Sequence, residues 1–381
     1  MSRVEITVAQ YRGYGYDCRT LVNAEPELPP IVLVGGAFQQ KGAWGRLETL
    51  LARSASVVTV DLPGWGDADL LPARYSTAFL AEALHHVLEL AGHRRAHVFG
   101  GSYGGAIAFR LAQHHPELVQ SLALMGTGAA VDEPLRSGLL RTIALLRADR
   151  VEEFAQYSVS LLTNDDPAAR IIRGPAVRRI LTGVFGGISA DDAAKFIENT
   201  LRLLKHELHG GYPLVTVPVL LGTGEHDDFT TPRQCRALGR YCADARFTAL
   251  RNADHAVHLE VPDALADLLL RFFSGRSLEG SAAWHSVQRC DVGHYEREDT
   301  GTEHNRSAAV RGERDAGPRW SAEEDEADEQ LRDGGRRPSG TPRDMLLDSR
   351  TGSRDSGVAA GAAPAPYATR PADPEPAAAL G

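Results

Sequence analysis

Hydrophobic and polar positions follow two alternating periods along the first three quarters of the chain. Short runs of Val, Ile and Leu, typical of strands buried on both faces, are separated by longer stretches with the three-to-four-residue spacing of amphipathic helices. The expected strands lie at residues 30–35, 56–61, 96–100, 121–125, 218–222 and 245–250, and the expected helices near 43–53, 77–91, 103–115, 232–240 and 258–273. Apolar strands that alternate with helices predict an α/β fold, with a mostly parallel sheet covered by helices on both faces.

Two segments depart from this alternation. Residues 4–22 are typical of an antiparallel hairpin at one edge of the sheet. Residues 132–211, between the fourth and fifth of the expected strands, have a mostly helical pattern and no good strand. Open α/β sheets bind ligands at the carboxyl ends of their strands, so we interpret this segment as a helical insertion over that edge. We expect it to act as a mobile lid that sets substrate choice.

The composition changes near residue 275. Residues 276–381 contain no Ile or Phe, carry 14 Arg against 20 Asp and Glu, and end in an Ala/Pro-rich stretch. Such a segment buries too little apolar surface to offset the chain entropy lost on folding. We therefore predict an α/β domain over residues 1–275, with the insertion at about 132–211, and a disordered, dispensable tail over 276–381. Trp284 and Trp320 are the tail residues best suited to dock on a folded surface.

Charge and cysteine content narrow the possible partners and the compartment. The net charge of −9 and the pI of about 5.9 give no reason to expect nucleic acid or an anionic membrane as a partner. The first residues lack the pattern of a signal peptide, and no apolar stretch approaches the roughly 20 residues that span a bilayer. Four cysteines without paired spacing are typical of free thiols, so we expect a cytoplasmic protein. Only three of the 41 basic residues are lysine, a bias that suggests a GC-rich bacterial genome.

The candidate nucleophile is Ser102. It stands in the sequence GGSYG at residues 100–104, directly after an expected strand and directly before an expected helix. In that context a G-x-S-x-G motif places the serine on a tight, strained turn above the sheet, and its small neighbours let the chain form the turn. The alternative is a glycine-rich loop that only tightens packing. The strand before and the helix after favour the catalytic interpretation.

A serine hydroxyl needs a base, and the base needs an orienting carboxylate. In folds with this serine turn, the chain order is Ser, then acid, then His. Three acids follow the fifth strand, Glu225, Asp227 and Asp228, and we select Asp227 because it lies a turn beyond the strand end. Two histidines follow the sixth strand. We select His255, in the loop, over His258, which falls within the next helix and is expected to pack.

The oxyanion of an acyl-transfer reaction is usually held by two backbone N–H groups. One comes from the residue after the nucleophile, here Tyr103, and the other from the loop after the first core strand. That loop reads GGAF at residues 35–38. We assign the second amide to Ala37 and expect Phe38 to contact the substrate. The alternative role of the glycines is turn formation alone.

These motifs together resemble the α/β-hydrolase superfamily over about residues 30–275. VGGA, followed by Trp44, is similar to the family's His-Gly-x oxyanion strand end, DLPGWG to its D-x-x-G-x-G loop, GEHD to its G-x-x-D acid turn and HAVHLE to its H-x-x-x-x-E segment. The four lie at residues 34–37, 61–66, 224–227 and 255–260. The resemblance implies the α/β-hydrolase fold, a cap formed by the helical insertion, and Asp227 as the acid. The chain departs from the family at Gly35, where a supporting His is usual, and this departure affects ordering of the loop more than the mechanism.

The other histidines give no indication of a metal or a cofactor. His206 and His209 are three residues apart, and the pairs at 85/86 and 114/115 are adjacent in the sequence. None of them joins a third ligand at a spacing typical of metal sites. We therefore predict that no metal and no cofactor takes part.

The predicted activity is hydrolysis of an ester, thioester or lactone of a small acyl substrate through an acyl-serine intermediate. A serine nucleophile argues against the dehalogenases and epoxide hydrolases of the family, which use Asp there. Acyl transfer to an alcohol or thiol uses the same triad and remains open. Proline iminopeptidases are similar in their Gly-Gly-Ser-x-Gly context, and their caps carry acidic residues, as this insertion does at Glu152, Glu153 and Glu198. An intact set of Ser, Asp and His disfavours a purely ligand-binding role.

Overall fold

The computed structural model describes residues 3–208 and 213–290, so the predicted tail beyond Cys290 lies outside the described residues. The described strands form one nine-stranded sheet in the order β1-β2-β4-β3-β5-β6-β7-β8-β9. The stretch from β4 to β8 in this order is parallel, while β1, β2 and β9 pair antiparallel with their neighbours. The strands are β1 (Arg3–Tyr11), β2 (Tyr14–Val22), β3 (Ile31–Val34), β4 (Val57–Asp61), β5 (Ala96–Gly101), β6 (Val119–Met125), β7 (Val219–Gly224), β8 (Ala245–Leu250) and β9 (Gln288–Cys290).

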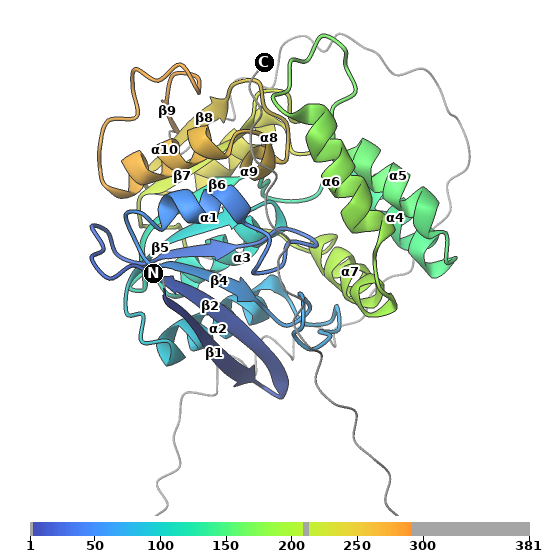
Figure 1. Cartoon of the computed structure of the whole chain (residues 1–381), viewed down its shortest axis with the longest axis horizontal. Helices are drawn as coiled ribbons and strands as arrows, with labels where there is room; N and C mark the ends of the chain where they lie inside the picture. The colour runs from blue at the N-terminus through green and yellow to red at the C-terminus, as the bar shows by residue number, and fades with distance from the viewer. Residues whose placement is uncertain (1–2, 209–212, 291–381) are drawn as a thin grey trace, which may run out of the picture. The chain divides into compact units, whose positions relative to one another are not determined.

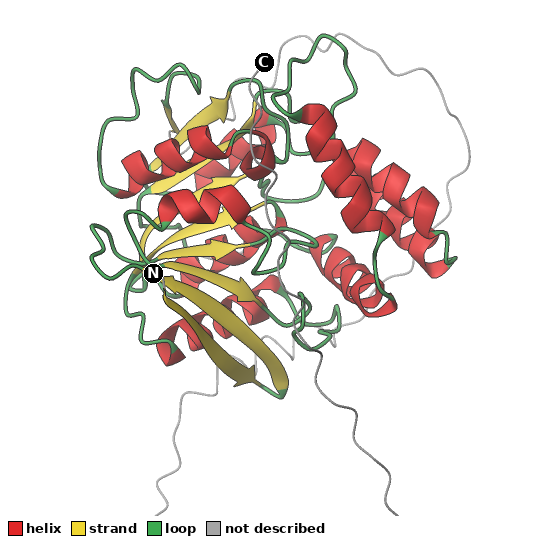
Figure 2. Ribbon diagram, viewed as in Figure 1, coloured by secondary structure: helices red, strands yellow, loops and turns green. Residues whose placement is uncertain are grey.

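Helices cover both faces of the sheet, as the alternation of elements predicted (Figure 2). One face carries α2 (Thr77–Leu90), α3 (Tyr103–His114) and α8 (Pro232–Ala237), and the other carries α1 (Gly45–Leu51), α9 (Val257–Glu260) and α10 (Pro262–Phe273). Successive residues of a strand point to opposite faces. Val32 of β3 therefore packs toward α2 and α3, whereas Leu33 packs toward α1 and α10, and both are fully buried. This double burial explains why the strand is apolar at every position.

The first two strands form the edge hairpin that the sequence predicted. Tyr11 pairs with Tyr14, and the two turn residues between them, Arg12 and Gly13, have φ angles of 48° and 88°. Two positive φ angles in a two-residue turn match the twist of the flanking strands. The hairpin joins the sheet through the antiparallel pairing of β2 with β4.

The order of the central strands creates a crevice at their carboxyl ends. From β3 the chain crosses to β4 on one side and then returns past β3 to β5 on the other side. The connections thus leave the ends of β3 and β5 in opposite directions, and open α/β sheets bind ligands at such a switch point. The loop after β3, which contains Ala37, and the turn after β5, which contains Ser102, meet at this edge.

Four helices form the insertion between β6 and β7. They are α4 (Glu133–Arg147), α5 (Val151–Leu162), α6 (Gly174–Gly186) and α7 (Ala190–Leu203). They lie beside the carboxyl edge of the sheet (Figure 1) and share an apolar cluster that includes Phe154, Phe185 and Phe196. None of the described helices is long and apolar enough to cross a lipid bilayer.

One helix of the insertion is tied to the core by buried polar side chains. Lys195, Asn199 and Arg202 of α7 are each less than 10% exposed. Together they donate hydrogen bonds of 2.6–3.0 Å to backbone carbonyls of the segment 64–75. Movement of the whole insertion would have to break these contacts.

The folded domain extends beyond the predicted boundary at residue 275. Residues 276–290 continue across the sheet edge and end in β9, which pairs antiparallel with β8. Trp284 is 3% exposed, packs in the apolar cluster of α1 and α10, and donates its indole N–H to Leu278 O at 2.8 Å. The prediction that the chain is disordered from residue 276 was therefore wrong for this stretch. One tryptophan and a three-residue strand can dock on an existing sheet edge, a feature that composition averaged over the whole tail hides.

Candidate active site

Ser102 lies on a strained turn between β5 and α3. Its φ of 50° and ψ of −121° fall in a region that residues other than glycine rarely adopt. Gly104 lets the turn pass close to the neighbouring strand, because a Cβ there would lie 2.2 Å from the carbonyl oxygen of Val34. Thr127, after β6, supports the turn by donating its hydroxyl to Ser102 O at 2.9 Å. The turn therefore presents the Ser102 side chain beyond the end of the strand.

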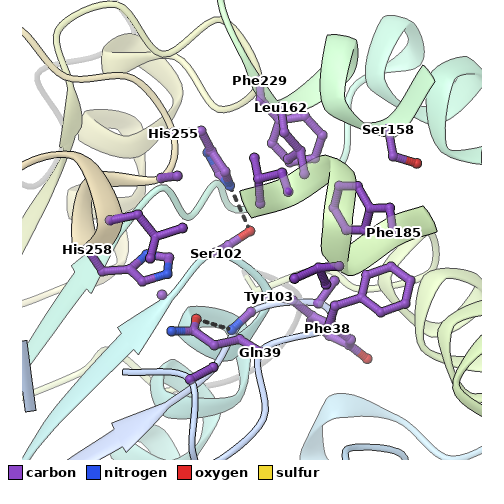
Figure 3. Close-up of a pocket in the computed structure, with 18 of the residues that line it drawn as sticks. Phe38, Gln39, Ser102, Tyr103, Ser158, Leu162, Phe185, Phe229, His255 and His258 are labelled. Atoms are coloured by element: carbon purple, nitrogen blue, oxygen red, sulfur yellow. Dashed lines mark hydrogen bonds between the residues drawn. The ribbon is translucent and has the colours of Figure 1, made fainter. Parts of the chain in front are cut away.

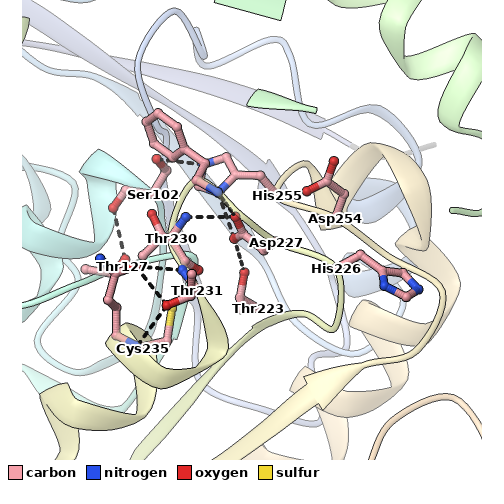
Figure 4. A network of polar contacts seen from close by, with 12 residues as sticks. Ser102, Thr127, Thr223, His226, Asp227, Thr230, Thr231, Cys235, Asp254 and His255 are labelled. Carbon is pink, nitrogen blue, oxygen red and sulfur yellow. Dashed lines mark hydrogen bonds and ion pairs between the residues drawn. The ribbon is translucent and has the colours of Figure 1, made fainter. Parts of the chain in front are cut away.

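Three side chains from different strand ends meet in one hydrogen-bonded row (Figure 4). His255 Nε2 lies 3.0 Å from Ser102 Oγ, and His255 Nδ1 lies 2.9 Å from Asp227 Oδ2. Ser102 follows β5, Asp227 follows β7 and His255 follows β8. A base within hydrogen-bond reach of a hydroxyl, and itself oriented by a carboxylate, has the geometry that activates a nucleophile.

Asp227 is surrounded by donors. Besides His255, its carboxylate accepts from the Thr223 hydroxyl and from the backbone N–H groups of Phe229 and Thr230, the latter two at 2.9 and 2.8 Å. The residue is 1% exposed, so these donors replace the water that the carboxylate loses on burial. They hold the carboxylate in one orientation toward the imidazole.

The other two candidate acids have different partners. Glu225 Oε2 lies 2.7 Å from His285 Nε2, and Asp228 accepts from Asn164 Nδ2 at 2.8 Å. Of the three acids weighed in the sequence, Asp227 is the one whose carboxylate lies beside His255.

The surroundings of His255 favour its protonated form. Burial alone would lower its pKa, but the charge of Asp227 and the hydrogen bond to it outweigh burial and raise the pKa above its usual value. His258 lies on α9, where its ring packs against Trp44 and burial lowers its pKa to about 4. His258 is thus a neutral packing residue on the wall of the cavity, and His255 is the histidine beside Ser102.

The two residues whose amides are expected to hold an oxyanion, Tyr103 and Ala37, both line the cavity beside Ser102. Tyr103 is the first residue of α3, so its N–H has no partner within the helix. Ala37 lies in the loop after β3 and lines the same cavity as Ser102. The neighbouring Gly36 passes so close that a Cβ on it would lie 3.2 Å from Ser102 Cβ.

Two side chains that the sequence analysis did not single out hold this loop. Trp65 donates its indole N–H to Gly36 O at 3.0 Å. Gln39 closes the turn, because its Oε1 accepts from Gly36 N and its own N–H donates to Gly36 O, both at 3.2 Å. A Cβ on Gly35 would lie 2.5 Å from Gln39 O, so this tight turn excludes the histidine that is usual in the family. Trp65 and Gln39 therefore order the loop in place of that histidine.

A cavity of about 210 Å³ opens beside Ser102, between the strand ends and the insertion. Phe38, Phe185, Phe229 and Leu162 surround the serine hydroxyl (Figure 3). Phe38 also stacks on Phe196 of α7, with ring centroids 4.4 Å apart. None of the described lining residues is Lys, Arg, Asp or Glu. The cavity thus suits an uncharged, largely apolar group.

The insertion also touches the loops that carry the acid and the base. Asn164, after α5, donates from Nδ2 to His226 O at 3.0 Å and to the Asp228 carboxylate, and its backbone N–H donates to the Asp254 carboxylate. These contacts link the insertion to the loop after β7, which carries Asp227, and to the loop after β8, which carries His255. No sequence signal marks Asn164, because a single polar residue in a loop is common.

Among the described residues, the other acids and histidines weighed in the sequence do not line this cavity, apart from His258 on its wall. Glu152 and Glu153 are not among its lining residues, and Glu198 accepts from the backbone N–H of Ala73. His206 is hydrogen-bonded to Leu203 O, and His209 lies outside the described residues.

The spacing argument against a third metal ligand fails for His85 and His115. These two residues come together with Glu82, because α2 and α3 pack side by side, a contact that spacing along the chain does not reveal.

Comparison with known proteins agrees with this architecture. A family model described as alpha/beta hydrolase fold matches residues 29–165. The chain is 25% identical over 264 residues to an (R)-3-hydroxydecanoyl-ACP:CoA transacylase of Pseudomonas putida, covering 68% of this chain and 86% of the relative. It is 28% identical over 265 residues to a pimeloyl-[acyl-carrier protein] methyl ester esterase of Neisseria meningitidis, covering 66% and 80%.

Solved structures show the same fold. An α/β-hydrolase enzyme from a Medee basin deep-sea metagenome library superposes with a TM-score of 0.63 at 17% identity, covering 72% of this chain and all of the other. The enol-lactonase of Burkholderia xenovorans superposes with a TM-score of 0.60 at 22% identity, covering 70% of this chain and all of that enzyme. With the sheet order, the serine turn and the family match, these likenesses show that the chain has the α/β-hydrolase fold.

Proposed function

We propose that the chain is a serine hydrolase that cleaves an ester, thioester or lactone through an acyl-serine intermediate. The observation that carries this proposal is the hydrogen-bonded row of Asp227, His255 and Ser102, which ends beside an uncharged cavity. A non-catalytic ligand-binding protein would have no need for this row or for the strained φ of Ser102, since strain persists only where the surrounding structure maintains it.

In the first half of the reaction, Ser102 Oγ attacks the carbonyl carbon of the substrate. His255 Nε2 takes the hydroxyl proton as the carbon–oxygen bond forms, and Asp227 stabilises the resulting imidazolium. The negative charge that develops on the carbonyl oxygen is held by the N–H groups of Ala37 and Tyr103. The imidazolium then gives its proton to the leaving alcohol or thiol as the bond to that group breaks, and the acyl group remains on the serine.

In the second half, water attacks the acyl-serine. His255 removes a proton from the water, a second tetrahedral intermediate forms and collapses, and the proton returns to Ser102 Oγ. The products are a carboxylic acid and the free enzyme. Each step moves one proton through the same imidazole nitrogen.

The cavity favours a neutral acyl chain. Burying a methylene group is favourable by about 0.8 kcal/mol, which corresponds to roughly fourfold in kcat/KM for each methylene that the cavity accepts. We expect kcat/KM to rise with acyl length until the cavity of about 210 Å³ is full and to fall beyond that length.

The lining argues against a proline-iminopeptidase-like activity. Recognition of a substrate amine in a buried site requires a carboxylate beside it. The described lining contains no Asp or Glu, and the acidic residues of the insertion lie elsewhere. Aminoacyl anilides are therefore expected to be poor substrates.

Acyl transfer is the second candidate, and the likeness to a transacylase favours it. The same acyl-serine serves both reactions, because an alcohol or thiol can replace water as the second nucleophile. An apolar cavity that limits access of water would promote transfer.

The test is a substrate panel with purified enzyme. It comprises p-nitrophenyl esters of increasing length, acyl-thioesters, lactones and aminoacyl anilides, each assayed with and without a thiol acceptor. Ester or thioester turnover that is lost in Ser102→Ala supports the proposal, and transfer of the acyl group to the thiol would identify a transferase. Turnover of the anilides alone, or none at all, would overturn it.

A further inference from the structure

A cluster of imidazoles and a carboxylate lies between α2 and α3, on the face of the sheet that these helices cover and apart from the cavity. Glu82 and His85 are one turn apart on α2, and His115 directly follows α3. One ligand atom from each of the three residues lies within 4.8 Å of the other two, and all three residues are partly buried. None of them lines the active-site cavity.

The contacts within the cluster are close. His115 Nε2 lies 3.0 Å from Glu82 Oε2, and the ring of His85 stacks on the ring of His115 with centroids 3.8 Å apart and planes at 4°. His114 Nδ1 lies 2.9 Å from the other oxygen of the same carboxylate, Glu82 Oε1. Two imidazoles and one carboxylate are therefore within a small rearrangement of a common point.

We propose that Glu82, His85 and His115 bind a Zn²⁺ ion. Imidazole nitrogen and carboxylate oxygen are preferred ligands of this ion, and a site with three protein ligands leaves a fourth tetrahedral position for water. His114 is not a ligand in this arrangement. It orients the carboxylate by a hydrogen bond, as outer-shell partners of metal ligands commonly do.

The geometry requires one side chain to move. Ligands at about 2.0–2.1 Å from a tetrahedral ion lie roughly 3.3 Å from one another, close to the separation of His115 Nε2 and Glu82 Oε2. The stacked rings have parallel in-plane lone pairs, which cannot converge on one ion, so metal binding must tilt the His85 ring out of the stack. The side chain of His85 is 23% exposed, so the ring is not enclosed on all sides.

The charges in the cluster suit a cation. Burial acts to raise the pKa of Glu82, but its hydrogen bonds with His114 and His115 outweigh burial and lower the pKa to about 2. Burial and, to a lesser extent, the nearby His115 lower the pKa of His85, which favours its neutral form. Glu89 lies 3.6 Å from His85, and Glu117 lies 3.4 Å from His115, which adds negative charge around the site.

The test is a calorimetric titration of full-length, tag-free protein with ZnCl₂ at pH 7.5, after treatment with EDTA and dialysis. His85→Gln and His115→Gln each remove one ligand. Since loss of an outer-shell partner alone costs about 10–100-fold in metal affinity, loss of a ligand should cost at least as much. The matched control is His86→Gln. His86 is next to His85 on α2, but its ring contacts Tyr11 and it is not part of the cluster.

Two further measurements keep the proposal testable if a ligand variant folds poorly. Co²⁺ added to the wild-type protein should give the visible absorption of a tetrahedral site, and Zn²⁺ should raise the thermal midpoint of wild type but not of His85→Gln. Ester turnover should be the same with and without the metal, which separates this site from the proposed catalytic one. Equal Zn²⁺ affinity in wild type and both ligand variants, or no stoichiometric binding in wild type, would overturn the proposal.

Discussion

A single carboxylate governs both the orientation and the basicity of His255. Asp227 accepts from His255 Nδ1, which leaves Nε2 facing Ser102 Oγ, and its charge raises the pKa of the imidazole against the effect of burial. Replacing this carboxylate by an amide keeps its shape but removes its charge and its acceptance from Nδ1, so one substitution tests both effects.

Replacement of Asp227 by Asn is expected to lower kcat by about 10⁴, because the amide favours the wrong tautomer of the histidine. Asp228→Asn is the matched control, since Asp228 is next in the chain and bonds to Asn164 instead. Its kcat should stay within a few-fold of wild type. A large loss in Asp228→Asn together with a mild one in Asp227→Asn would show that the acid is assigned to the wrong residue.

The pH profile of kcat/KM should fall on the acid side. His255 acts as a base only when neutral, so activity is lost as pH falls through its pKa. Because Asp227 raises that pKa, the inflection is expected above the usual value of about 6.5. His258→Gln should leave the inflection in place, since the pKa of His258 is about 4. An inflection below pH 6, or one that moves in His258→Gln, would contradict this assignment.

At the scale of elements, the insertion divides into a part bound to the core and a part that shapes the cavity. α7 is held to the core by three buried polar side chains, whereas α6 presents Ile180 and Val184 to the cavity with more than 40% of each residue exposed. Residues at such a mouth can change without loss of core packing. We therefore expect α6 to set the accepted chain length.

Val184→Trp should reduce kcat/KM for long acyl esters by about tenfold or more relative to acetyl esters, because overfilling a packed site costs about 1–3 kcal/mol. The melting temperature should change little. Thr182→Trp places the same side chain at an exposed position of α6 that does not line the cavity and is expected to keep the chain-length profile of wild type. Equal loss on all esters in Val184→Trp, in step with a fall in melting temperature, would argue for a purely structural role.

The segment after α10 is a second element with a testable contribution. Trp284 is 3% exposed within the cluster of α1 and α10. Trp284→Ala should lower the free energy of unfolding by about 3–5 kcal/mol, as large-to-small changes at buried aromatic sites do. Arg289→Ala, at an exposed position of β9, should change it by less than about 0.5 kcal/mol. Denaturant titration measures both, and equal stabilities would mean that residues 276–290 do not contribute to the fold.

For the whole molecule, the sequence predicted the features that depend on a local pattern of residues, namely the core strands and the residues at their ends. The six core strands are apolar because both their faces are buried, and Ser102, Asp227 and His255 follow strand ends that a parallel sheet brings to one edge. The sequence could not predict contacts between elements that are far apart in the chain. Arg202 binding carbonyls before α2, Asn164 linking two loops, and His115 meeting Glu82 depend on tertiary packing that leaves no periodic signal.

The domain boundary was misplaced for a related reason. Composition is an average, and residues 276–290 add one buried tryptophan and one strand pairing to a surface that the rest of the chain has already built. An isolated segment of this kind would not fold, but a docked one needs few apolar residues. Ser102, Asp227 and His255 all precede this segment, but His285 within it bonds to Glu225 in the loop that carries Asp227.

The most direct test of the central claim is covalent labelling of Ser102. Full-length protein is treated with a fluorophosphonate probe, digested, and the labelled peptide identified by mass spectrometry, with Ser102→Ala and Ser158→Ala as parallel samples, because Ser158 also lines the cavity. The account predicts one labelled site at Ser102, no labelling of Ser102→Ala and undiminished labelling of Ser158→Ala. Labelling at another residue, or equal labelling of Ser102→Ala and wild type, would contradict it.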